Sequence, residues 1–274
     1  MVNWDRSDVS FVGKKSAFSS SNNIRGIRIC IGVVLFIGSW QILHSFFVNP
    51  FLLPSPLQVL KTMWDLTISG ELPDDIYESS RRIAVGYVGG SAIGIVFGLL
   101  MGRFRSINDL MSPFLEFLRP LSPVALLPLV LIWFGIGESA KYILVGYTAA
   151  IIVLLNTAFG VNRMPIIRSR AAQCLGASEW QMFMNVLLPS VIPYIVVGMR
   201  TALGFSFMAI VAAELIAAES GLGYLIMQSR ILIQVDQTFA GLITLSLLGA
   251  LSDLLFRMTL SKMTVRYQYD LLNI

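Results

Sequence analysis

The sequence predicts an all-α integral membrane protein with six transmembrane helices, and three features lead to that prediction. Only 13% of the 274 residues are charged, about half the share found in soluble globular domains. The mean hydropathy is +0.74, and the apolar residues gather into runs near the roughly 20 residues that cross a bilayer. So few charges leave too little polar surface to keep a 30.3 kDa chain in water.

Six apolar runs are the predicted spans. The first follows a polar tail and has no small-residue cleavage site after it, so we expect an uncleaved anchor. The third is short and contains Pro123 and Pro128. The spans are Ile29–Val48, Ile83–Met101, Leu121–Phe134, Tyr142–Gly160, Val191–Ala218 and Phe239–Leu260.

Lysine and arginine residues orient these spans. The N-terminal tail, the loops after the second and fourth spans and the C-terminal end together hold 14 of them, whereas the opposite side holds five. The larger group includes Arg103, Arg105 and Arg119, and the smaller group includes Arg82 and Lys141. Cytoplasmic loops carry the excess of basic residues. Both termini are therefore expected in the cytoplasm, and residues 49–80 outside.

The same pattern divides the chain into four predicted segments. Residues 1–27 form a cytoplasmic tail, and residues 28–76 contain the first span and an outer loop. Residues 77–262 form the core of the remaining spans, and residues 263–274 form a second cytoplasmic tail. The tail of 1–27 is serine-rich and partly basic, which is typical of a disordered segment.

Glycine recurs every four residues along the second span, at Gly86, Gly90, Gly94, Gly98 and Gly102. Residues four apart lie on one face of a helix, and a face without side chains lets another helix approach closely. We expect this face to pack against a neighbouring helix. A sliding surface for a moving helix is the alternative.

The segment from Pro165 to Pro193 is too polar for a span and too long for a simple turn. Its apolar residues are compatible with two short amphipathic helices, and Gly176 interrupts them as a turn would. Pro189 and Pro193 mark the entry to the fifth span. The sequence thus predicts a compact helix–turn–helix at the cytoplasmic face, able to transmit a push from a soluble partner.

This segment resembles the EAA loop of ATP-binding-cassette importer permeases. The resemblance is carried by Ala171-Ala172, three residues, Gly176, nine residues and then Val186–Pro189. Arg170 stands where the family has an acidic residue. Further stretches are similar to the nitrate, sulfonate and taurine branch, and closest to aliphatic sulfonate and taurine permeases, although Ser122-Pro123 replaces a pair of prolines. These stretches are Phe51–Leu60, Leu118–Lys141 and Val211–Arg230.

The resemblance implies a type I importer permease fold with a coupling helix between helices 4 and 5. It also implies a permease homodimer in a bacterial inner membrane, two ATPase subunits and a solute-binding protein. ATP and magnesium would be held by the ATPase, and no cofactor by this chain, which has no phosphate-binding G-x-x-x-x-G-K-[ST] loop. The coupling-loop residues that it implies are Arg170, Ala171, Ala172, Gly176, Ala177, Leu188 and Pro189.

Polar residues in the spans are the candidates for a translocation path, because an ionisable group in a bilayer normally has a partner or a function. Arg200 and Asp253 lie at matched depths of antiparallel spans, which predicts a contact between them; direct anion binding by Arg200 is the alternative. Asn156 could line the path or bond a neighbouring helix, and Trp133 could form its wall or sit at the interface. Glu214 is a further path candidate. Glu219 is either a contact for the binding protein or a solvated loop charge.

Other function classes fit the sequence less well. An ion-coupled secondary transporter often has internal repeats and buried charge relays, and neither is evident here. A membrane-embedded enzyme needs a nucleophile with a base, or metal ligands, and one histidine and two distant cysteines supply little. A structural anchor leaves the helix–turn–helix unexplained. The basic residues are accounted for by topology, so no nucleic-acid partner is expected.

Overall fold

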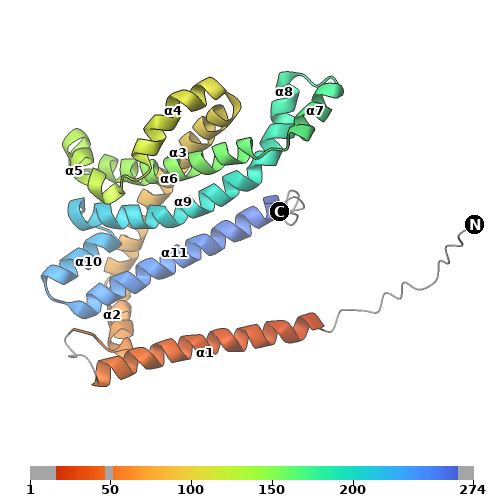
Figure 1. The fold of residues 1–274 in the computed structure, drawn as a ribbon. Helices are drawn as coiled ribbons and strands as arrows, with labels where there is room; N and C mark the ends of the chain where they lie inside the picture. Colours follow the sequence, from red (N-terminus) through yellow and green to blue (C-terminus); the bar gives the residue numbers. More distant parts are fainter. Residues whose placement is uncertain (1–16, 47–51, 265–274) are drawn as a thin grey trace, which may run out of the picture. The chain divides into compact units, whose positions relative to one another are not determined.

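The computed structural model describes residues 17–46 and 52–264, which form helices and no strands. The chain divides into two compact units, residues 1–59 and 60–274. The helices are α1 (Ala17–Phe46), α2 (Pro56–Ile68), α3 (Glu71–Arg103), α4 (Arg105–Leu118), α5 (Pro123–Phe134), α6 (Glu138–Asn162), α7 (Ile166–Cys174), α8 (Glu179–Met182), the π-helix η1 (Phe183–Leu187), α9 (Leu188–Ala217), α10 (Leu222–Ile231) and α11 (Val235–Thr264) (Figure 1). All-α architecture is confirmed for the described residues.

Unit 1–59 holds the first predicted span. Its helix α1 is apolar over Val34–Phe46, and two side chains tie the end of α1 to the following turn. Trp40 Nε1 donates to the carbonyl oxygen of Pro54 at 3.1 Å, and His44 Nδ1 lies 2.6 Å from the carbonyl oxygen of Leu53. The last residues of the predicted span, 47 and 48, lie outside the described residues.

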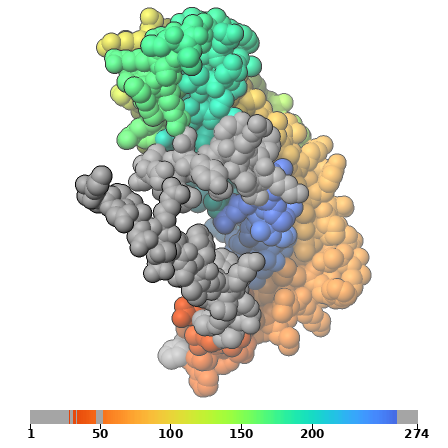
Figure 2. All heavy atoms as spheres, turned by 90° about the vertical axis from the view of Figure 1, so that its right-hand side faces the viewer, coloured from red at the N-terminus to blue at the C-terminus, as the bar shows by residue number. Residues whose placement is uncertain are grey.

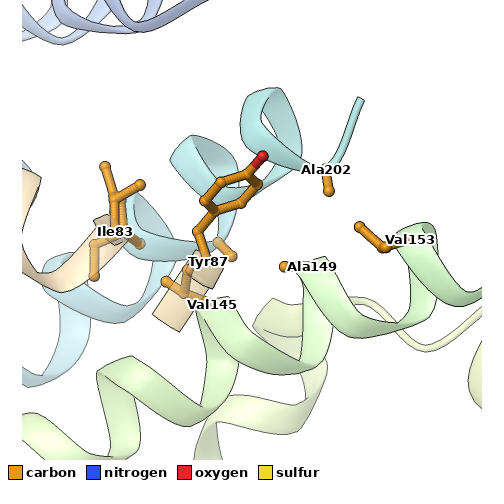
Figure 3. Packing of buried hydrophobic residues seen from close by; sticks show 8 residues of the cluster. Ile83, Tyr87, Val145, Ala149, Val153 and Ala202 are labelled. Carbon is orange, nitrogen blue, oxygen red and sulfur yellow. The ribbon is translucent and has the colours of Figure 1, made fainter. Parts of the chain in front are cut away.

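Helices α3, α6 and α9 form the core of unit 60–274. Helix α6 lies between the other two, parallel to α3 and antiparallel to α9, which in turn lies beside α11 (Figure 1). Small and β-branched side chains fill the contact between the three helices, which allows close packing. Figure 3 shows Ile83 and Tyr87 of α3, Val145, Ala149 and Val153 of α6 and Ala202 of α9 in this cluster.

The glycine face of α3 packs against α6, as the sequence predicts. A Cβ atom added at Gly86 would lie 2.7 Å from Cβ of Val145, and one added at Gly98 would lie 2.6 Å from Cβ of Thr157. At Gly90 it would run into the backbone carbonyl of Gly146. The two backbones therefore approach more closely than any larger residue on this face of α3 would allow.

Four helices are long and apolar enough to cross a membrane, and they contain the second, fourth, fifth and sixth predicted spans. They are Glu71–Arg103, Glu138–Asn162, Glu179–Ala217 and Val235–Thr259. The third predicted span is different. Helices α4 and α5 are long and apolar enough to cross a membrane only when taken together, and the pair is bent by 101°. The described residues thus hold four helices that are long and apolar enough to be spans, or five if the bent pair is one span.

The bend between α4 and α5, which we call the elbow, comprises residues 119–122 and has a local cause. The residue before a proline avoids the helical region, and Ser122, just before Pro123, is extended with φ −68° and ψ 138°. The elbow lies beside the middle of α6, since the Tyr147 hydroxyl donates to the carbonyl oxygen of Leu118 at 2.8 Å. Placing Arg119 in a cytoplasmic loop was therefore wrong: it lies at the elbow.

Helix α3 also begins earlier than the sequence predicts. Residues 71–80 were expected in an outer loop, but they form the first turns of α3 because Leu72, Asp75 and Ser79 are buried against the rest of the unit. A separate helix, α10, follows α9 and was not predicted. Helix α11 is joined to α2 by a hydrogen bond in which Thr62 Oγ1 donates to Asp236 Oδ2 at 2.8 Å.

The contact between α3 and α6 predicts opposite effects for two neighbouring glycines. Gly90→Ala should lower the free energy of unfolding by about 1–3 kcal/mol, the usual cost of overpacking, because its Cβ has no room beside Gly146. Gly89→Ala is the matched control, since Gly89 is exposed with no atom near its added Cβ. It should be neutral or stabilising by up to about 1 kcal/mol.

Denaturant unfolding of both variants in one detergent measures this difference. Equal stability of Gly90→Ala and Gly89→Ala would contradict the close approach of the two helices.

Candidate functional site

An ion network holds together the end of the bundle at which α10 lies. At its centre is Arg82 of α3, whose side chain is only 2% exposed. Its Nε and Nη2 atoms donate to the two carboxylate oxygens of Glu138, each at 2.8 Å. Its Nη1 donates to Glu214 Oε1 at 2.8 Å and to the Ser220 carbonyl oxygen at 2.6 Å, and Nη2 also donates to Ser220 Oγ at 3.0 Å. All five N–H donors of a guanidinium thus have acceptors.

Glu214 of α9 is the buried acid of this network. Its side chain has no exposed surface, and it accepts from Ser79 Oγ at 2.9 Å and from the backbone N–H of Gly223 at 2.9 Å, in addition to Arg82. A buried charge is tolerated when it is paired and fully hydrogen-bonded. Glu214 was predicted as a path residue; in this conformation its carboxylate joins α9 to α3 and α10.

The N-terminus of α10 is held by the same face of α3. Asp75 Oδ1 accepts from the N–H of Gly221 at 2.7 Å, and Ser79 Oγ accepts from the N–H of Leu222 at 2.9 Å. The first N–H groups of a helix have no partner inside the helix, so these side chains satisfy them. Gly221, with φ 110°, adopts a conformation that favours glycine.

Sequence reasoning missed Arg82 as a network residue, although a signal was present. The glycine face of α3 runs from Gly86 to Gly102 in steps of four, and Arg82 is one step earlier. Continuing the face therefore places Arg82 against the same neighbours as the glycines. An acid at membrane depth, Glu214, also required a basic partner.

The predicted contact between α9 and α11 is confirmed. Arg200 Nε donates to Asp253 Oδ1 at 2.7 Å, and its Nη2 donates to Oδ2 at 3.3 Å. Arg257, one turn further along α11, also donates to Asp253 Oδ2 at 2.8 Å. Two of these charges, Arg200 and Asp253, line a cavity of about 530 Å³ between the two helices, together with Gly204 and Gly249.

The other predicted path residues lie apart from one another. Asn156 lines a second cavity, of about 680 Å³, and its Nδ2 donates at 2.8 Å to the carbonyl of Ile152 in its own helix. Of the two alternatives for Asn156, the bond to a neighbouring helix is thus replaced by a bond within α6, and the side chain lines a cavity. Trp133 is exposed near the end of α5, and Glu219 is exposed between α9 and α10.

At the opposite end, α7, the turn at Gly176 and α8 form the predicted helix–turn–helix. Figure 2 shows this segment, in green to teal, at the upper end of the view. Gly176 has φ 76°, and Ser178 and Gln181 form a capping box that starts α8. Pro189 falls in the first turn of α9, as expected.

The surface of this helix–turn–helix is unusually apolar. Leu175 is 88% exposed and Trp180 69% exposed, and Ile166, Ile167 and Met184 are exposed as well. Among the predicted coupling-loop residues, Arg170, Ala171 and Gly176 are exposed, Ala177, Leu188 and Pro189 are half-buried, and Ala172 is buried. Contiguous exposed apolar residues mark a surface for a partner.

Polar side chains of the described residues join the helix–turn–helix to the long helices. Arg103, the last residue of α3, forms an ion pair with Glu179 of α8. Arg168 Nη1 donates to Ser190 Oγ of α9 at 3.2 Å. The segment is therefore attached to α3 and α9 by side chains as well as by the chain itself, and its movement would carry both helices.

Comparison with known proteins finds a matching family model and relatives that cover most of the chain. A family model described as the binding-protein-dependent transport system inner membrane component matches residues 91–265. The chain is 36% identical over 221 residues to a probable ABC transporter permease protein of Brucella melitensis, covering 81% of this chain and 89% of the relative.

Other relatives carry more specific names. The taurine transport system permease protein of Escherichia coli is 34% identical over 249 residues, covering 88% of this chain and 90% of the relative. The nitrate import permease protein of Synechocystis is 29% identical over 249 residues with the same coverage.

The buried network predicts a large effect for one acid and a small effect for its neighbour. Glu214→Ala should lower the free energy of unfolding by about 3–5 kcal/mol, because it leaves Arg82 buried without one of its acids. Glu219→Ala removes an exposed acid five residues away and should change the free energy of unfolding by about 0.5 kcal/mol or less. Denaturant unfolding in detergent measures both, and similar losses in the two variants would refute the buried network.

The shared acid between α9 and α11 predicts an order of effects. Asp253→Asn frees two cations, Arg200 and Arg257, whereas Arg200→Gln leaves Asp253 paired with Arg257. The melting temperature should therefore fall further for Asp253→Asn than for Arg200→Gln. The melting temperature of the double variant should be no lower than that of Asp253→Asn alone. A larger loss from Arg200→Gln, or additive losses, would argue against one shared pair.

Proposed function

The chain belongs to the family of binding-protein-dependent transport system inner membrane components, and on that premise we propose that it carries a small oxyanion across the membrane. It is a multi-pass permease of the inner membrane, related to permeases of ATP-driven import systems. The proposed substrate is a sulfonate of the taurine type or a similar anion. Relatives named for taurine, aliphatic sulfonates and nitrate support this class of substrate.

The observation that carries the coupling proposal is the apolar surface of the helix–turn–helix. Leu175 and Trp180 lie on this segment of two short helices, and most of the surface of each is exposed. An ATPase subunit with a matching groove would bury them, and burial of apolar area is the main driving force of such association. In this proposal ATP and magnesium belong to the ATPase, and the two termini lie on its side of the membrane.

A push on α7 and α8 would move α9 as a lever. Helix α9 has 30 residues, which corresponds to about 45 Å at the helical rise. One end is tied to the helix–turn–helix through Arg168 and Ser190, and Glu214 near the other end is tied to Arg82. Movement driven at one face would thus reach the network at the other face.

Transport would follow by alternating access. Nucleotide binding in the ATPase would favour one arrangement of two permease copies over another, and it can shift the equilibrium only by its difference in affinity for the two. A solute-binding protein would deliver the anion at the α10 end, where Glu219 is exposed. An ion-coupled transporter, the alternative from sequence, is not favoured by the family.

Docking of an ATPase predicts loss of the complex on changing one exposed leucine. Leu175→Ser should reduce the ATPase subunit recovered with the tagged permease by at least about tenfold, equivalent to about 1.4 kcal/mol. The matched control is Ile136→Ser, because Ile136 is 83% exposed and lies between α5 and α6 at the α10 end. It should leave recovery unchanged.

The assay is co-purification after mild detergent extraction, with the permease checked by gel filtration. A wild-type permease that stays folded but retains no ATPase would overturn the proposal. Equal recovery with Leu175→Ser and Ile136→Ser would overturn the docking surface only.

A further inference from the structure

The larger cavity, of about 680 Å³, lies where the elbow meets α6 and α9. Residues 119–124 form one side of it, and Tyr147, Asn156 and Met208 are among the residues on the other sides. Among the described residues that line it, none is acidic and Arg119 alone is charged. In contrast, the smaller cavity between α9 and α11 contains both Arg200 and Asp253.

Arg119 lies at membrane depth. The carbonyl of Leu118, its neighbour, accepts from Tyr147, which is nine residues, or about 14 Å, from the start of the 25-residue helix α6. That position is within the middle part of a candidate span. The elbow therefore places Arg119 at the level of the middle of this candidate span.

Among residues 17–46 and 52–264, no acid lies within ion-pair distance of Arg119. Ion pairs of the described residues join Arg81, Arg82, Arg103, Lys141, Arg200 and Arg257 to acids, but not Arg119. An unpaired cation at this depth costs at least about 2.5–3.5 kcal/mol on insertion scales, and such residues face a water-filled cavity or the bundle interior and mark ion pathways. Arg119 is exposed, so the cavity side of the elbow is best explained as an aqueous path.

Two further groups of the cavity suit an anion. The N-terminus of α5 begins at the elbow, directly after Ser122. Its first N–H groups already donate to Ser122, so it contributes only the positive end of the helix dipole, which favours negative charge. Asn156 Nδ2 uses one bond for the carbonyl of Ile152, and an amide nitrogen has a second N–H to donate. By contrast, the hydroxyls of Tyr147 and Thr148 already donate to backbone carbonyls.

We propose that Arg119, at the elbow between α4 and α5, is a binding residue for the oxyanion group of the substrate within the membrane. The guanidinium would hold two sulfonate oxygens through parallel N–H donors, the arrangement that makes arginine suited to planar or tetrahedral oxyanions. This inference rests on the proposed function for its substrate class. It adds the residue and the place at which the bundle meets the anion.

Binding of methanesulfonate to the purified permease tests the site. The permease is placed in phosphatidylcholine nanodiscs, so that no anionic lipid competes. Saturation-transfer difference NMR detects binding even when the Kd is as weak as the millimolar range. Arg119→Gln should weaken binding at least about tenfold, whereas Arg119→Lys, which keeps a point charge, should weaken it less. Arg105→Gln is the matched control, because Arg105 is exposed at the start of α4 outside the cavity.

The outcomes separate this inference from the proposed function. No methanesulfonate binding by the folded wild type, or equal binding by Arg119→Gln and Arg105→Gln, would overturn the anion site. Addition of anionic lipid that abolishes the wild-type signal would assign the cation to a lipid headgroup and overturn it as well. Recovery of the ATPase subunit is measured on the same samples, so that its loss in wild type counts against the importer and leaves the binding result standing.

Discussion

The close approach of α3 to α6 is the constraint on which the rest of the bundle depends. Five glycines at four-residue intervals leave no side chain of α3 between the two backbones, and Val145 and Val161 of α6 fill the space where Cβ atoms on α3 would be. Lipid tails are as apolar as leucine, so helices in a bilayer gain little from apolar burial and depend on contacts of this kind. Helix α9 packs on this pair, and the cavities lie on its remaining faces.

Several features of the fold were predictable because they follow from local sequence patterns or from depth within the predicted spans. Glycine spacing predicted the packing face, and Gly176 with two prolines predicted the helix–turn–helix before α9. The pairing of Arg200 with Asp253 followed from depth in two antiparallel spans. What the sequence did not reveal depends on contacts between distant residues: Arg82 meets Glu214 across 132 positions, and no local pattern states that pairing. The elbow was missed because a proline break looks like a short span when only hydropathy is counted.

Charge placement sorts the polar residues by what they do. Arg82 has acceptors for each of its donors and is 2% exposed, so it fixes helix positions and has no capacity left for a ligand. Arg200 shares Asp253 with Arg257 and keeps part of its surface open. Arg119 has no acid at all among the described residues. The three arginines thus form a series from fully paired to unpaired, and availability for an anion follows the same order.

The Arg82 network also sets an order for assembly of the chain in the membrane. Ribosomes deliver Arg82 first, Glu138 56 residues later and Glu214 132 residues later. Until α6 has been inserted, the arginine has neither of these acids, and the last helix to complete its shell is α9. Until then Arg82 can pair with Glu78 of its own helix, whose Oε2 lies 3.7 Å from Nη2, and its two remaining acids arrive in two later steps as α6 and then α9 enter the bundle.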